Sequence, residues 1–228
     1  MIDHARDLVS VHDATERLLT AAAKLDNAAV TEPSRLPGWT RGHIVAHLAR
    51  NADALVNVLE GRPMYVSAEA RDADIERDAP RPLDVQLTDV RATAARFQDT
   101  GAAPADWSRT VELRNGVTDS ASRVPFRRWV EVELHHVDLG IGYELEDLPE
   151  EFVERETDFL AARFSGHPDV PSTRLTDGTH AWSTGRAADA PAVTVTGSRP
   201  DLLGWLAGRR DGAGLTTDGG PLPALPPL

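Results

Sequence analysis

Apolar residues recur at intervals of three and four along four separate segments in the first two-thirds of this 228-residue chain. Such spacing places them on one face of an α-helix, and that face must be buried against other helices. We expect long helices at residues 4–25, from Thr40 to just before Gly61, from Leu83 to Phe97, and at about 125–139. Four such helices with short connections predict an antiparallel four-helix bundle.

The composition changes after Gly140. One more amphipathic helix is expected from Pro149 to Phe164, and strand-like pieces separated by Gly, Asp and Pro turns follow it. We place strands at 179–183 and 192–196, a short helix at 201–208 and a further strand near Leu215. The predicted fold class is therefore α+β, with a helical-bundle domain at residues 1–145 and a small α+β domain at residues 146–228.

The charge of the chain excludes several classes of partner. The formal charge is −12, from 36 acidic and 24 basic residues. Such a surface repels phosphate backbones and anionic lipid, so we expect neither nucleic acid nor membrane as a partner. The first residues lack the basic start and apolar centre of a secretory signal, and we expect a soluble, cytoplasmic monomer. Small anionic substrates remain possible, because arginines can reverse the potential inside a pocket.

The absence of cysteine restricts the available chemistry further. It excludes disulfides, thiolate metal ligands and a cysteine nucleophile. Any bound metal must be held by His, Asp or Glu. Any thiol chemistry must use a thiol supplied from outside the protein.

Two of the predicted helices each carry a pair of possible metal ligands four residues apart, His43 with His47 and Glu131 with His135. Residues at this spacing share one helix face. If the two faces meet, His47, Glu131 and His135 converge and leave a position open for water or substrate, as a catalytic zinc site requires. Hydrogen bonds in the core or at a helix cap are the structural alternative for each pair.

Two further residues bear on this arrangement. His136 and His43 are competing imidazoles, but His136 lies about 100° round the helix from His135, so both cannot reach one ion. Asp138 lies one turn beyond His135. It can either orient an imidazole or form a hydrogen bond near the helix end.

Several segments resemble the mycothiol-dependent maleylpyruvate isomerases, which belong to a wider group of DinB-like metal-binding bundles. The sequence Leu-Pro-Gly-Trp-Thr at 36–40, with Ala-His-Leu at 46–48, carries the resemblance in the first half. The segment 128–139, which reads Arg-Trp-Val-Glu-Val-Glu-Leu-His-His-Val-Asp-Leu, carries it in the last long helix.

The resemblance also includes Pro-Met-Tyr-Val-Ser-Ala-Glu-Ala-Arg at 63–71, which is more particular to the isomerase than to the wider group. It continues into Val-Thr-Val-Thr-Gly-Ser at 193–198 and Leu-Ala-Gly-Arg at 206–209, and so covers nearly the whole chain. The connector before Pro63 is shorter than the family pattern.

This resemblance implies zinc, or another divalent metal, bound by His47, Glu131 and His135. It also implies a C-terminal domain similar to sterol carrier proteins, and functional arginines at Arg71 and Arg209, with Arg210 as the adjacent alternative. Since the second arginine comes from the small domain, we expect the pocket to lie between the two domains.

The family's reaction is the cis–trans isomerisation of maleylpyruvate to fumarylpyruvate in gentisate breakdown, with mycothiol as the external thiol. Two alternatives stay open. A mycothiol-dependent S-transferase on the same scaffold would keep the three metal ligands but need no paired arginines. A non-enzymatic metal-binding regulatory module would show a partner-binding apolar patch and no activity with any thiol.

Overall fold

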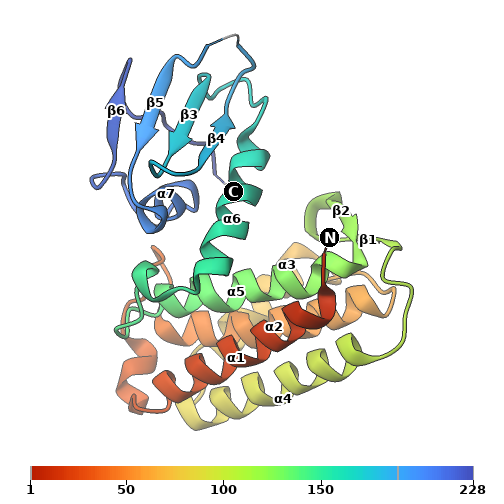
Figure 1. The fold of residues 1–228 in the computed structure, drawn as a ribbon. Helices are drawn as coiled ribbons and strands as arrows, with labels where there is room; N and C mark the ends of the chain where they lie inside the picture. The colour runs from red at the N-terminus through yellow and green to blue at the C-terminus, as the bar shows by residue number, and fades with distance from the viewer. Residues whose placement is uncertain (1, 189, 228) are drawn as a thin grey trace. The chain divides into compact units, whose positions relative to one another are not determined.

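The computed structural model describes residues 2–188 and 190–227. The chain forms two compact units, Met1–Tyr143 and Glu144–Leu228, and each has its own core. The first unit is helical and the second contains a four-stranded sheet, so the fold is α+β, as predicted (Figure 1). Within the described residues, no helix combines the length and the apolar character needed to cross a membrane.

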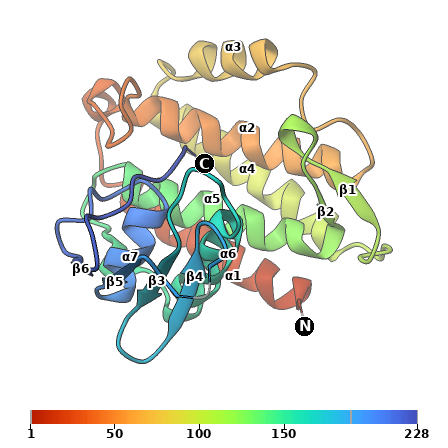
Figure 2. The ribbon, with the colours of Figure 1, turned by 90° about the horizontal axis from the view of Figure 1, so that it is seen from above.

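Four long helices form the bundle of the first unit: α1 (His4–Ala22), α2 (Arg41–Leu59), α4 (Leu83–Ala102) and α5 (Val124–Asp138). Both α1 and α2 pack against α4 and α5 (Figures 1 and 2). Their apolar stripes supply a core of mostly aliphatic side chains, including the fully buried Leu18, Ile44, Leu55 and Val132. The four predicted long helices are confirmed, although α1 ends three residues earlier than expected.

The start of α2 is fixed by a capping box. The side chain of Thr40 accepts a hydrogen bond from the backbone N–H of His43, and the backbone N–H of Thr40 donates to Nδ1 of His43. These contacts satisfy two N–H groups that a helix start leaves unpaired. Thr40 is therefore the N-cap, as predicted, and His47 lies about two turns into the helix.

Two features of the first unit were not predicted. Helix α3 (Ala68–Asp78) packs against α2 and buries only Ile75 and Asp78, so it carries no apolar stripe for a periodicity argument to detect (Figure 2). The segment between α4 and α5 contains a short antiparallel hairpin, β1 (Thr110–Glu112) and β2 (Thr118–Ser120). Asn115 and Gly116 lie at the turn of this hairpin, and both have positive φ, 59° and 71°.

The second unit combines two helices with a mixed sheet of order β4–β3–β5–β6. Its elements are α6 (Glu150–Phe164), β3 (Thr173–Thr176), β4 (Ala181–Thr184), β5 (Val193–Thr196), α7 (Arg199–Leu206) and β6 (Thr216–Asp218). Strand β3 pairs parallel with β5 and antiparallel with β4, while β5 pairs antiparallel with β6. The sequence did not predict β3, the central partner of β4 and β5.

Candidate metal centre

The structure brings His47 of α2 together with Glu131 and His135 of α5. Nε2 of His47 lies 2.9 Å from Oε2 of Glu131, and Nε2 of His135 lies 3.3 Å from the same oxygen. One ligand atom from each residue falls within 4.8 Å of the others. Side chains 84 residues apart in the chain, His47 and Glu131, therefore meet at one point together with His135.

The donor set of this cluster suits a divalent cation. Two imidazole nitrogens and one carboxylate oxygen form a ligand set that zinc and several other divalent ions accept. The two histidine side chains are only 6% and 11% exposed, whereas that of Glu131 is 32% exposed. The cluster is thus enclosed on the imidazole side and accessible on the carboxylate side, where an external molecule can approach.

The protonation of the three residues follows from burial and from their mutual hydrogen bonds. Burial lowers the pKa of His47 to about 4, so its imidazole is neutral at pH 7. Burial also disfavours the charged form of His135, but hydrogen bonds with Asp138 and Glu131 outweigh it and raise the pKa of His135. Burial opposes ionisation of Glu131 as well, yet both histidines hold the pKa of its carboxyl well below the usual value.

Asp138 orients one of the imidazoles. Its side chain is fully buried, and Oδ2 lies 2.9 Å from Nδ1 of His135. A proton on Nδ1 donates to this carboxylate, which leaves Nε2 of His135 directed at Glu131. Of the two roles expected for Asp138, the contact with His135 is the one observed.

The two competing histidines lie outside the cluster. His43 is used at the helix cap through Nδ1, and its Nε2 lies 3.3 Å from Glu76. His136 is buried and stacks on the ring of Tyr143, with the ring centres 4.0 Å apart. The spacing along the sequence alone could not decide which of His43 and His47 joins Glu131 and His135, whereas the structure places His47 there.

Arg71 lies beside the cluster. On α3, its Nη2 is 3.3 Å from Nδ1 of His47, and its Nη1 donates to Asp72 at 2.6 Å. The guanidinium carbon lies 5.9 Å from the centre of the Tyr65 ring. A cation is therefore placed next to the proposed metal ligands.

The other predicted arginine belongs to the second unit. Nη1 of Arg209 donates to the carbonyl oxygen of Ala207 at 2.7 Å. Arg210 forms ion pairs with Asp201 and Glu146, both at 2.6 Å. These pairs give Arg210 a structural role within its own unit, so we retain Arg209 as the functional candidate. Its role, and the pocket expected between the domains, stay predictions.

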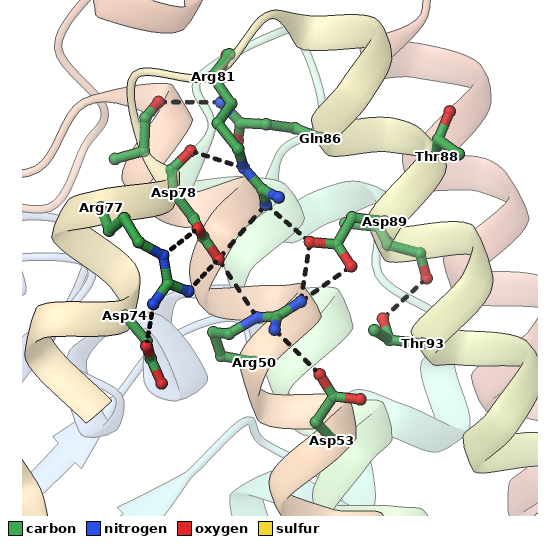
Figure 3. A network of polar contacts seen from close by, with 12 residues as sticks. Arg50, Asp53, Asp74, Arg77, Asp78, Arg81, Gln86, Thr88, Asp89 and Thr93 are labelled. Carbon is green, nitrogen blue, oxygen red and sulfur yellow. Dashed lines mark hydrogen bonds and ion pairs between the residues drawn. The ribbon is translucent and has the colours of Figure 1, made fainter. Parts of the chain in front are cut away.

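Charged side chains hold α3 in place (Figure 3). Asp78, 3% exposed at the end of α3, lies 3.6 Å from Nε of Arg50 on α2 and 3.5 Å from Nη2 of Arg81. Both arginines also bond Asp89 of α4, at 2.8 and 2.7 Å. This network of Arg50, Asp78, Arg81 and Asp89 joins α3 to two bundle helices, and Arg71 lies on the helix that it fixes.

We expect the substitution Asp78→Asn to lower the free energy of unfolding by about 2 kcal/mol. This loss lies between those typical of breaking an exposed ion pair and of breaking a buried one. The arginines around it would keep their charges and lose their shared carboxylate. Thermal denaturation should show a Tm lower by about 5 °C. Asp74→Asn is the matched control, because Asp74 is 46% exposed and pairs only with Arg77 among the described residues. Equal losses in both variants would contradict a special role for Asp78.

Sequence reasoning missed a second connection between the ligand helices. The guanidinium of Arg128 is 1% exposed, and its Nη1 donates to Oδ1 of Asn51 at 2.8 Å. Arg128 lies one turn before Glu131, and Asn51 lies one turn after His47. The Asn51–Arg128 contact therefore fastens α2 to α5 directly beside the cluster. Helical spacing from the ligands was the available signal, since both residues share the ligand faces.

Comparison with known proteins shows similarity along nearly the whole chain. The family model of the mycothiol maleylpyruvate isomerase N-terminal domain matches residues 11–140, and that of the corresponding C-terminal domain matches residues 147–227. A crystal structure of the mycothiol-dependent maleylpyruvate isomerase matches with a TM-score of 0.89 and 28% sequence identity, over 99% of this chain and 97% of that chain. A crystal structure of a histidine-to-alanine mutant of that isomerase matches with the same values. A search of curated proteins gave no match.

Proposed function

The chain belongs to the mycothiol maleylpyruvate isomerase family, and from this membership we propose that it is a thiol-dependent isomerase that converts maleylpyruvate to fumarylpyruvate with mycothiol as the thiol. The observation that carries the proposal is the cluster of His47, Glu131 and His135 in a chain that both domain models match. The proposal places the reaction in the cytoplasm, as a step in gentisate breakdown, carried out by a monomer.

We propose that His47, Glu131 and His135 hold a divalent metal, with zinc as the ion that the family resemblance implies. A divalent cation held by these residues would lower the pKa of a bound thiol, so that thiolate would be available at neutral pH. The chain itself has no cysteine, so the sulfur must come from a small molecule. The 32% exposure of Glu131 leaves the cluster open on one side for that molecule.

The proposed reaction needs a temporary loss of the double bond, because rotation about a C=C bond is prohibitively slow. The thiolate adds to one alkene carbon, and a C–S bond forms while the π electrons move to the conjugated carbonyl as an enolate. Rotation then occurs about a single bond. Elimination breaks the C–S bond, restores the alkene in the trans configuration and releases the thiolate, so no net oxidation or reduction takes place.

The chain's own residues supply charge and position for these steps. Arg71 pairs with a substrate carboxylate and stabilises the negative charge that builds up on the enolate, because a guanidinium binds carboxylates in a bidentate manner. Its position 3.3 Å from His47 supports this role. We include Arg209 as the second arginine of the same clamp. Asp138 keeps His135 in its orientation through the hydrogen bond at Nδ1.

An absorbance assay tests the proposal directly. Purified protein is mixed with maleylpyruvate, with and without mycothiol, and with and without a chelator. We expect isomerisation only when both the thiol and the metal are present, and recovery when Zn²⁺ is added back after chelation. Conjugation of a haloarene to mycothiol, with no turnover of maleylpyruvate, would instead identify an S-transferase. Inactivity toward both would favour a non-enzymatic role.

A further inference from the structure

The first unit contains a pocket of about 540 Å³ that the proposed chemistry does not use. Its walls are the segment after α2, between Gly61 and Ala68, and the segment from Arg109 to Gly116, which contains β1 and the hairpin turn. The lining includes three arginines and one glutamate, namely Arg62, Arg109, Arg114 and Glu112. The excess of positive charge, in a protein whose net charge is −12, favours an anionic ligand here.

The pocket borders the metal cluster through adjacent side chains. Tyr65 forms part of its wall and lies against Arg71, whose guanidinium carbon is 5.9 Å from the Tyr65 ring centre. Arg71 in turn contacts His47 at 3.3 Å. Burial is the main cause of a raised pKa of Tyr65, with Glu131 raising it further and the cations Arg71 and Arg114 opposing the rise. Charges on the pocket side and on the cluster side therefore act on the same hydroxyl group.

The three arginines of the pocket differ in what they already bind. Arg109 donates to the carbonyl oxygens of Leu59 and Asp106, and thereby ties the hairpin to the end of α2. Arg62 is paired with Glu60 and Asn57. The side chain of Arg114 is exposed at the hairpin turn and forms no hydrogen bond or ion pair with any residue that the structure describes. Arg114 is the guanidinium available to a ligand.

We propose that this pocket binds the carboxylate of the substrate's 2-oxo acid end, and that Arg114 is the specificity-determining residue which recognises it. The inference rests on the proposed function, because the alkene must lie at the metal cluster and the 2-oxo acid end must then extend away from it. A planar guanidinium at the wall of the pocket is well suited to recognise a carboxylate, because it donates two parallel hydrogen bonds. The neutral sugar portion of the thiol, in contrast, would gain little from the excess of arginines.

The test compares two substrates in one assay with mycothiol. Maleylpyruvate carries the distal carboxylate, while maleylacetone ends in a methyl ketone at that position. For the Arg114→Gln variant, we expect kcat/KM for maleylpyruvate to fall about tenfold or more, as expected for the loss of a charged hydrogen bond. For maleylacetone the change should stay below about twofold, because no carboxylate is lost. Arg114→Lys should retain an intermediate preference for the diacid.

Arg91→Gln provides the matched control, since Arg91 is an exposed arginine on α4 away from the pocket lining. It should leave the ratio of the two kcat/KM values unchanged. Equal losses for both substrates in Arg114→Gln, no loss for either, or an effect only on the KM for mycothiol would overturn the inference. A wild-type chain that isomerises neither substrate would refute the proposed function and this inference with it, whereas an active wild type with an unchanged preference in Arg114→Gln would refute only the inference.

Discussion

Replacement of His47 by alanine is expected to remove the metal and the isomerase activity together. Among the described residues, His47 is the one proposed ligand that α2 contributes to the cluster, and its neutral, buried imidazole faces Glu131 at 2.9 Å. Without it, two ligands from one helix remain, and the several kcal/mol of charge stabilisation that the metal supplies would be lost, so turnover should fall about a thousandfold. Metal content by elemental analysis and the isomerisation assay, measured on the same preparation, check the result.

His43→Ala is the matched control for this experiment. His43 lies one turn earlier on the same helix but is used in the capping box with Thr40. The variant should retain metal and activity while losing about 1 kcal/mol of stability from the cap. A His47→Ala protein that binds metal at the wild-type stoichiometry, or a His43→Ala protein that loses it, would show that the ligands have been assigned wrongly.

Replacement of Arg71 by alanine should leave metal binding intact, in contrast to the replacement of His47. Arg71 is not a ligand, so the protein should bind metal normally, but the cation beside the reacting centre would be gone. We expect kcat to fall by about 10²- to 10³-fold, the usual result of removing one charge-stabilising donor from an active site. Steady-state kinetics together with metal analysis separate this outcome from loss of the cluster.

Two further variants sharpen the test of Arg71. Arg71→Lys keeps the charge without the planar fork and should recover only part of the activity. Arg91→Ala removes an exposed arginine elsewhere in the first unit and should behave as the wild type. Full isomerase activity in Arg71→Ala would exclude this residue from the mechanism.

The sequence predicted the bundle because its helices are stabilised by apolar faces. Each of the four long helices buries a stripe that a 3.6-residue period reveals, such as Val132 and Val137 on α5. Helix α3 escaped detection for the converse reason, since it buries one apolar side chain, Ile75, and is held by Asp78. Strand β3 has four residues, with only Thr173 and Leu175 buried, which is too short a pattern to distinguish from a loop.

The candidate site was predictable in part for a related reason. Candidate ligands at positions i and i+4 of a helix can be recognised in the sequence. The three residues selected in this way are the ones that the structure brings together. The choice of His47 over His43 depends on how α2 is rotated, and the contact between Asn51 and Arg128 depends on which helices are neighbours. Both are properties of packing between distant segments, so helical spacing could place Asn51 and Arg128 on the ligand faces but could not show that they meet.

Helix α3 is attached to the bundle by ion pairs rather than by an apolar face. The residue proposed to bind substrate, Arg71, therefore lies on a different kind of support from the proposed metal ligands. The residues proposed as metal ligands lie on helices whose interiors are close-packed, where substitutions disturb many neighbours at once. Arg71 lies on a helix that contributes one apolar side chain to that interior. Substitutions on the surface of α3 should therefore disturb the packed interior of the bundle less than substitutions on α2 or α5, so the surroundings of Arg71 can be varied separately from the three proposed ligands.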